Sequence, residues 1–520
     1  LSHYTLNYKF YKSNEEVVAT GKERSWYPFL TSITQGTGIN YNRPISFEYH
    51  NINNDEIYLP NSFSNSKDLY GYYNGIEKEI QNLPQPVGAS NKLPEIYIYP
   101  GLPENEKYRY FPIPDYTGSV YKLSGRKNEG ELKSLLSGVI KSIRQPEGGV
   151  ISLTYEKNTY FDVQTGRNEY AGGIRVKSMR TYDGVDHNKD IVIHYDYDHL
   201  TGNSSGKLLT KPLFAQHVGF YLDPSNETLV NQSVINQWPE QEYWKRTTIR
   251  APRDQSGDLL NYSGVLYENV TQYQVGKGKV VYEYDVPVDY LTTSYVSWNA
   301  TQSKIARSGL TSGTYEDIRA FIGTGNYPQA MNTTSNYLNG QLLTSSIYDE
   351  AGQLLSKADY TYDYNFPYQS LQGIRREMMT TQKTDGSDVS MYVYAPYTLR
   401  LGAVALQTDQ ITTTYEYDNG SPIAMTTQRT NQFDNTAYPA LRSMTTTDAE
   451  GTEYSTQYTY NQDYPIVAGS SDEWANTIER MGELNRSMIP VETIQTIKKV
   501  GQNSLVTGAA VQRYLFLTGD

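Results

Sequence analysis

The chain has 520 residues, a formal net charge of −12 and no cysteine. The absence of cysteine excludes disulfides, thiolate zinc sites and cysteine nucleophiles. The chain is acidic overall and has no long basic run. This argues against a nucleic acid partner, because a phosphate backbone is bound by a basic surface.

Tyrosine dominates the composition, with 50 residues, while charged residues make up only 20%. It is large, amphipathic and strand-favouring, so it can cover a sheet that stays wet on one side. No apolar run approaches the roughly 18 residues of a transmembrane helix, so no transmembrane segment is expected. No signal peptide is visible at Leu1, and the chain starts and stops within its pattern. We expect a mature product or a piece of a longer chain.

Residues 1–130 form the first predicted region, a loop-rich β region. Alternating segments at 4–10 and 45–49 predict strands. Residues 61–130 carry seven prolines, which remove donors from a strand ladder, so long central strands are not expected there.

Residues 131–300 form the second predicted region, a central sheet. A short helix is expected at 131–136, followed by strands at 139–145 and 150–156 around a Pro-Glu-Gly-Gly turn. In the second strand Ile151, Leu153 and Tyr155 alternate with polar residues, which predicts one dry face and one wet face.

Further alternation follows in this region. After Gly172-Gly173, Ile174 and Val176 alternate with Arg175 and Lys177, which places the two basic residues on the same face. Strands are also expected at 191–198 and 280–285, with a glycine turn at 276–278.

Residues 301–469 form the third predicted region, which repeats. Turns that end in glycine occur at Gly352, Gly386, Gly420 and Gly451, at spacings of 34, 34 and 31 residues. Tyr/Thr strands flank each turn, and a period of this size indicates stacked supersecondary units. A short helix is expected near 314–321, where Thr314 and Asp317 fit a capping pair.

Residues 470–520 form the fourth predicted region. Ser470 and Glu473 fit a capping box, which predicts a helix over about 472–485. Pro490 ends it, and strands return at 491–500.

The order of these segments resembles the RHS/YD-repeat proteins of Bacteroidetes, which are large secreted or surface chains. The resemblance is carried by GVIKSIRQPEGG, AGGIRVKSM and HYDYD in residues 138–198, by DLYGYYNG at 68–75, and by the pattern from Tyr348 to Leu355. The stretch at 484–492 resembles a later segment of them. The resemblance implies a curved or spiralling sheet that forms part of a hollow shell.

The densest polar cluster offers a candidate cation site. Its members are Asp183, Asp186, His187, Asp190, His194, Asp196, Asp198 and His199. The spacing does not fit an EF-hand loop, because Leu200 stands where an oxygen ligand is needed. Wet strand faces and turns normally carry such residues, and we favour that interpretation over a metal site.

Three aromatic residues, Trp238, Tyr243 and Trp244, suggest a sugar-stacking platform, although buried anchors under a loop are the favoured interpretation. No nucleophile elbow is present, so nucleophilic catalysis has no support. Asp223-Pro224 lacks the glycine context of the family's self-cleaving core, so autoproteolysis is not expected.

The sequence therefore predicts a mainly β protein of stacked antiparallel hairpins with a few short helices. We expect a non-enzymatic scaffold with no catalytic, cofactor-binding or metal residues. The resemblance implies a secreted or cell-surface location and export by the type IX route. The implied partner is a cargo segment of the same longer chain, toxin-like or adhesive, or an outer-membrane secretion or motility complex. A cell-surface carbohydrate-binding or glycan-degrading module is the first alternative, and a closed β-propeller the second.

Overall fold

A computed structural model describes the chain over most of its strands. With side chains it covers residues 4–13, 26–36, 44–52, 57–59, 68, 70, 72–73, 130–163, 166–199, 201–208, 265–286, 340–364, 371, 404–434, 439–464, 472–484, 486, 488–512 and 514. It describes the backbone alone at 3, 37, 40–41, 53, 56, 95–98, 110–111, 121–124, 215–221, 243–249, 305–307, 369–370, 372–382 and 388–401. Within these residues no helix is long and apolar enough to cross a membrane.

The chain divides into two compact units. The N-terminal unit comprises Leu1–Tyr267, Val288–Thr334 and Gln372–Leu399. The C-terminal unit comprises Glu268–Pro287, Ser335–Leu371 and Arg400–Asp520. Each unit is described by itself, and the four regions expected from the sequence remain a prediction.

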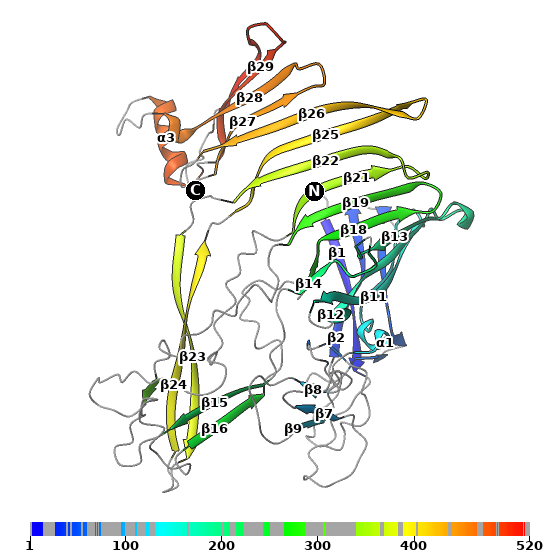
Figure 1. Cartoon of the computed structure of the whole chain (residues 1–520), viewed down its shortest axis with the longest axis vertical. Coiled ribbons are helices and arrows are strands. Elements are labelled where there is room, and N and C mark those ends of the chain that lie inside the picture. The colour runs from blue at the N-terminus through cyan, green and yellow to red at the C-terminus, as the bar shows by residue number, and fades with distance from the viewer. Residues whose placement is uncertain are drawn as a thin grey trace. The chain divides into compact units, whose positions relative to one another are not determined.

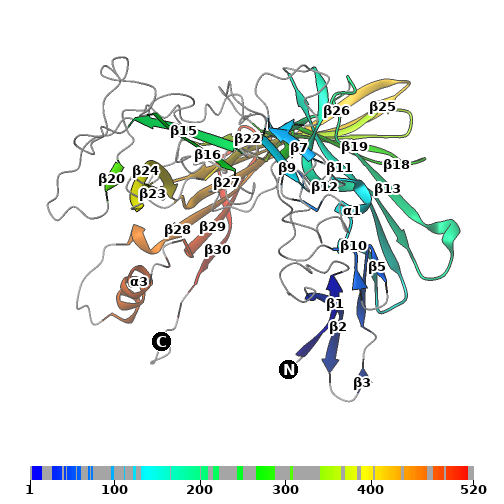
Figure 2. The same cartoon turned by 90° about the horizontal axis from the view of Figure 1, so that it is seen from below.

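The main sheet of the N-terminal unit has the strand order β1-β2-β4-β10-β11-β12-β13, and every neighbouring pair is antiparallel. Its strands are β1 (His3–Ser13), β2 (Trp26–Thr37), β4 (Ile45–Tyr49), β10 (Ile140–Arg144), β11 (Val150–Asp162), β12 (Arg167–Tyr182) and β13 (Ile191–Asp196). The short strand β3 (Asn40–Tyr41) pairs antiparallel with the end of β2. Strand β6 (Glu56–Ile57) pairs parallel with β1 and antiparallel with β5 (Ile52–Asn53). The four-residue helix α1 (Leu132–Leu135) lies beside β12 (Figure 2).

Smaller sheets accompany it. They are β14 (Gly206–Leu208) with β17 (Val265–Tyr267), β15 (Ala215–Tyr221) with β16 (Tyr243–Ile249), β7 (Glu95–Ile98) with β8 (Tyr110–Phe111) and β9 (Tyr121–Ser124), and β20 (Ile305–Arg307) with β24 (Asp388–Leu401) and β23 (Gln369–Gln382).

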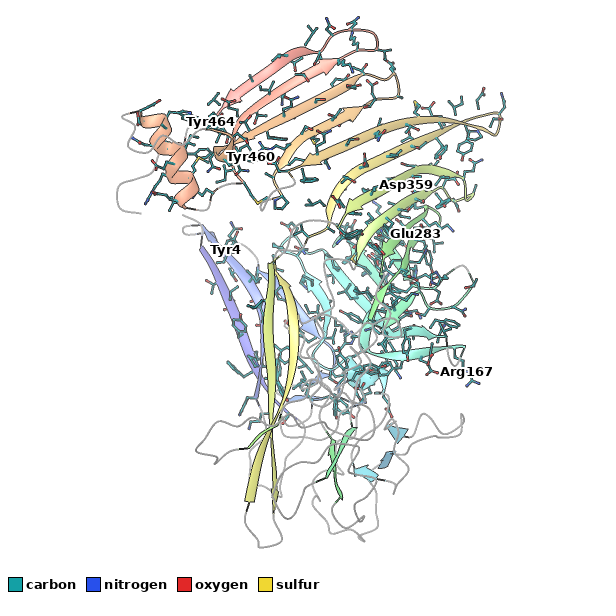
Figure 3. The ribbon with its side chains drawn as sticks, turned by 60° about the vertical axis from the view of Figure 1, so that its left-hand side comes forward. Tyr4, Arg167, Glu283, Asp359, Tyr460 and Tyr464 are labelled. Carbon is teal, nitrogen blue, oxygen red and sulfur yellow. The ribbon has the colours of Figure 1, made fainter. Side chains whose placement is uncertain are left out.

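The C-terminal unit is built on ten antiparallel strands that follow one another across the sheet in chain order (Figure 1). They are β18 (Asn269–Gln274), β19 (Gly278–Asp285), β21 (Gln341–Tyr348), β22 (Leu354–Asp363), β25 (Leu406–Asp418), β26 (Ser421–Phe433), β27 (Leu441–Thr447), β28 (Glu453–Tyr460), β29 (Pro490–Lys498) and β30 (Leu505–Val511). Helix α3 (Glu473–Glu483) packs on the start of β29 through Ile478, Met481 and Val491. Tyr460 and Tyr464 lie beside this helix (Figure 3).

The predicted mainly β fold of stacked antiparallel hairpins is confirmed. The turns that end at Gly352, Gly420 and Gly451 join neighbouring strands, and all three glycines have positive φ. The turn at Gly386 and the helix near 314–321 lie outside the described residues.

Two local expectations are wrong. Asp472, not Ser470, caps α3, because its carboxylate accepts the backbone N–H of Trp474 at 2.9 Å. The dry face expected in β11 is also absent: Ile151, Leu153 and Tyr155 are only half-buried, and the buried residues lie further along, at Asn158, Tyr160 and Asp162. Alternation predicts a dry face only where a second layer covers the sheet, and among the described residues β14 and β17 cover β11 at its far end.

A recurring contact explains much of the tyrosine content. At eight places an extra residue bulges from a strand, and the carbonyl just before it accepts a side-chain donor from the next strand of the sheet. Seven donors are tyrosine hydroxyls, at 2.7–3.1 Å: Tyr49 to Leu30, Tyr155 to Ile140, Tyr197 to Val176, Tyr362 to Leu342, Tyr417 to Leu354, Tyr460 to Leu441 and Tyr514 to Pro490. The eighth is the amide of Asn431, which donates to Gln407 at 3.0 Å.

The physical reason lies in the bulge itself. An extra residue interrupts the ladder and leaves a backbone group without its strand partner. A tyrosine hydroxyl donates to that carbonyl while its ring covers the pleated surface. One side chain therefore satisfies the acceptor and covers the sheet. We call this arrangement the bulge–tyrosine contact.

Removing one such hydroxyl should therefore cost stability. Tyr460 is 3% exposed and donates to the Leu441 carbonyl at 2.8 Å. Tyr460→Phe is expected to lower the unfolding free energy of the C-terminal unit by about 1–2 kcal/mol, because a part-buried carbonyl loses its donor. Tyr458→Phe, on the same strand, should change it by less than about 0.5 kcal/mol. Urea unfolding of both variants measures the difference, and equal effects would contradict the role of the bulge.

Candidate functional site

A network of polar side chains in the N-terminal unit joins β11, β12, β17 and the residue that follows β13. Arg175 lies at the centre of this network, and its side chain is only 12% exposed. The guanidinium carbon lies 4.4 Å from the ring centre of Tyr197 and 4.9 Å from that of Tyr267, so two rings enclose the cation. Its Nε donates to Glu156 at 2.7 Å, and one terminal nitrogen donates to Thr159 Oγ1 at 3.2 Å.

The surrounding residues complete the network. The Tyr267 hydroxyl donates to Asn158 Oδ1 at 3.1 Å and accepts the backbone N–H of Thr159 at 3.2 Å. Burial raises the pKa of Tyr197 to about 12, and the positive charge of Arg175 opposes that rise. Burial of the Arg175 side chain lowers its pKa. The interactions with Tyr267 and Glu156 raise the pKa by more, so the pKa of Arg175 is raised overall. The cluster therefore holds a permanent cation inside the fold.

A second cluster joins two segments that are about one hundred residues apart in the chain. Asp68 is fully buried, and its Oδ1 accepts the backbone N–H groups of Tyr70 at 2.9 Å and Tyr72 at 2.8 Å. Its Oδ2 accepts the Tyr170 hydroxyl at 2.6 Å, and that hydroxyl accepts the N–H of Gly173 at 3.0 Å. We call this arrangement the Asp68 clamp, because it joins Asp68, Tyr70 and Tyr72 to β12.

Glycine makes the close approach possible. Gly172 and Gly173 have φ values of +81° and +68°, a region that favours glycine. A Cβ on Gly172 would lie 2.4 Å from Cγ of Tyr70, whose hydroxyl donates to the Tyr170 carbonyl at 2.8 Å. The sequence motifs DLYGYYNG and AGGIRVKSM thus meet in space.

The clamp should depend on pH. Burial raises the pKa of Asp68 to about 6, although bonds from Tyr170, Tyr72 and Tyr70 favour the ionised form. Because the folded pKa lies above the unfolded value, folding favours the protonated acid, and the added stability is lost as the pH rises through about 6. Between about pH 7 and about pH 4 the clamp should gain about 2 kcal/mol.

Hydrogen exchange of the Tyr70, Tyr72 and Gly173 amides measures this gain as slower opening at the lower pH, after correction for intrinsic exchange. Asp68→Asn is the control, since it carries no titrating group at this site. The expectation fails if the variant keeps the same dependence on pH.

The predicted acidic cluster is distributed over turns. Asp183 Oδ1 accepts the N–H groups of Val185 and Asp186 at 2.8 and 3.0 Å, and these bonds lower the Asp183 pKa. Asp186 Oδ1 in turn accepts the N–H of Asn188 at 2.9 Å, as the cap of a single 3₁₀ turn. These carboxylates therefore hold the connection between β12 and β13.

Asp190 and Asp196 of this cluster also bond to neighbouring groups. Asp190 pairs with Arg180 and lies 3.2 Å from His187 Nδ1, and Asp196 accepts the N–H of Asp198 at 3.0 Å. Across the part of the chain that the structure describes, no group of three or more His, Asp or Glu side chains is placed to hold a metal ion.

Other sequence candidates cannot be placed. Trp238 and Asp223-Pro224 lie outside the described residues. Tyr243 and Trp244 lie in β16, where only the backbone is described.

Sequence reasoning missed the two clusters. It put Arg175 on one face with Lys177, yet their side chains are 12% and 62% exposed. The extra residue in β12 is Lys177, which opposes no residue of β11, so regular alternation ends between them. Asp68 was noticed only as part of a resembling motif, and the double glycine of β12 was the one local sign of a close approach.

Comparisons with known proteins are sparse. No protein-family model matches the sequence, and no curated protein matches it significantly. Among solved structures, the TcdB2–TccC3 complex aligns over 94% of this chain and 22% of its own chain, at 10% identity and a TM-score of 0.27. The Tc holotoxin pore of Photorhabdus luminescens aligns over 69% and 15%, at 10% identity and a TM-score of 0.23.

This chain thus spans about a fifth of the length of the first of these neighbours. Likenesses of this size carry no argument about fold or activity, and the fold assigned above rests on the strand pairing.

Proposed function

We propose that the protein is a non-enzymatic scaffold whose sheet forms a wall that encloses or presents a cargo segment. The observation that carries the proposal is the two-sided character of the C-terminal sheet over β18 to β26, where the described strands have no dry core. None of the fully described strands from β18 to β26 contains a buried hydrophobic residue.

One face of this sheet is tied together by polar side chains. Cross-strand hydrogen bonds join Thr413 with Thr426 at 3.1 Å, Thr430 with Asp409 at 2.9 Å, Thr445 with Ser455 at 2.9 Å and Thr344 with Asp359 at 3.2 Å. Such pairs stabilise a sheet through its own surface. This polar face needs no second layer, although Ile411 is also exposed on it.

The opposite face, here called the apolar face, exposes large hydrophobic side chains. The strand register places Ile347, Ile423, Met425, Tyr454 and Leu505 on it, with exposed fractions of 42%, 52%, 41%, 48% and 63%. We infer that another polypeptide binds this face, because exposed hydrophobic surface is a common site of protein binding. An extended or unfolded segment fits it, because the residues are spread over several strands.

The finer parts of the proposal come from the resemblance to RHS/YD-repeat proteins. They are a secreted or cell-surface bacterial location, a cargo segment of the same longer chain, and, as the other partner, an outer-membrane secretion or motility complex. The hydrogen bonds of Asp68 and Arg175 support a scaffold role, because both side chains bond to other groups of the same fold.

Binding of an unfolded polypeptide tests the proposal. The probe is a fluorescent, permanently unfolded peptide rich in Leu and Phe, and fluorescence anisotropy measures its affinity. Ile423→Ser, Met425→Ser and Tyr454→Ser together should weaken binding by about tenfold or more, since three apolar contacts are lost. Thr413→Ser, Thr426→Ser and Thr445→Ser, on the polar face, form the matched control and should leave it unchanged.

Absence of binding, or equal effects of the two triple variants, would contradict the cargo role. Sugar binding on a glycan array that is lost in Trp238→Ala would instead support the carbohydrate-binding alternative.

A further inference from the structure

Strand β30 (Leu505–Val511) is an edge of the sheet among the described residues. It pairs with β29 on one side, and among the described residues no strand pairs with its other side. Leu505, Val506 and Val511 are 63%, 68% and 60% exposed. The strand reads LVTGAAV and has neither the charged residue nor the proline that protects natural edges from added strands.

The same strand carries a bulge. Thr496 pairs with Val506 and Gln495 with Gly508, so Thr507 is the extra residue. By the rule of the bulge–tyrosine contact, the carbonyl of Val506 is the group that accepts a donor from the next strand. Within the part of the chain that the structure describes, no side chain donates to it.

We propose that the β30 edge binds an antiparallel β-strand of a partner polypeptide that carries a tyrosine, whose hydroxyl donates to the Val506 carbonyl. The eight completed contacts supply the template, since each donor lies on, or just beyond, the strand that follows the bulged one. The partner strand extends the backbone ladder along the outward-facing groups of β30, and its tyrosine satisfies the carbonyl before the bulge. This inference does not depend on the cargo role.

A second copy of β30 does not meet this requirement. The segment LVTGAAV contains neither tyrosine nor asparagine, the two residue types that supply the donor in the eight completed contacts. Tyr514, which follows β30, already donates to Pro490 at 3.1 Å. The occupant is therefore a different strand with its own tyrosine.

The chain itself supplies a probe. Strand β25 lies against the bulge of β22, and its Tyr417 donates to Leu354 at 3.0 Å. A labelled peptide with the sequence of residues 406–418 should bind the whole protein and slow exchange of the β30 amides. The Tyr417→Phe peptide should bind about threefold to tenfold more weakly, the loss expected for one hydrogen bond.

Variants of the protein locate the binding. Ala509→Lys places a charge on the exposed edge strand and should abolish peptide binding. Asn503→Lys, at an exposed position before β30, is the matched control and should bind normally. Far-UV circular dichroism confirms that both variants are folded.

The proposal is overturned if the two peptides bind equally well, or if β30 gains no protection. It is also overturned if the protein associates with itself through β30 in a manner abolished by Ala509→Lys, because the occupant is then a second copy.

Discussion

Arg175→Ala is expected to lower the unfolding free energy of the N-terminal unit by about 3–5 kcal/mol, a large loss for one side chain. The guanidinium lies between the rings of Tyr197 and Tyr267 and donates to Glu156 and Thr159. Truncation removes these contacts and leaves Glu156, whose side chain is only 29% exposed, without its close partner.

Lys177→Ala is the matched control for this prediction. Lys177 is on the same strand and also approaches Glu156, at 3.8 Å, but its side chain is 62% exposed. An exposed ion pair contributes little, so the loss should stay below about 1 kcal/mol. Urea unfolding followed by tyrosine fluorescence measures both variants, and a comparable loss for the two would show that burial of Arg175 is not what stabilises the cluster.

Gly172→Ala is expected to open the Asp68 clamp and cost about 3 kcal/mol or more. The new methyl would lie 2.4 Å from Tyr70, and the φ of +81° is unfavourable for alanine. Limited proteolysis near residues 68–73 and hydrogen exchange at Gly173 should both accelerate.

Gly166→Ala separates the two causes. Gly166 has a φ of +66° but nothing within 4 Å of its added Cβ, so only the backbone cost of about 1 kcal/mol applies. In a Tyr70→Ala background, Gly172→Ala should also fall to about that value, because the clash is gone. If Gly172→Ala lowered the stability of the Tyr70→Ala protein as much as that of the unchanged protein, a clash with Tyr70 would not be the cause.

The sequence predicted the elements well where the chain repeats. Glycine turns followed by Tyr/Thr alternation located the β21–β22, β25–β26 and β27–β28 hairpins, because a tight turn and strands of period two depend on neighbouring residues. It located α3 but chose the wrong cap, since Ser470 and Asp472 both offer a suitable oxygen and only the backbone path selects one.

The sequence did not predict the bulge–tyrosine contacts. Each joins a tyrosine to a carbonyl at least 15 residues away, and a bulge shifts register by a single residue. Alternation therefore fails at the positions where the contact forms, as at Lys177 in β12.

By itself the sequence determined the class of the protein: a tyrosine-rich, cysteine-free chain of hairpins whose turns and strand period are local properties. Only the tertiary structure decided that Asp68 is buried, that the Arg175 side chain lies between two rings, that Gly172 touches Tyr70, and that no described strand pairs with the second edge of β30. The physical reason is that burial and strand pairing depend on segments up to about a hundred residues apart, which no local pattern records.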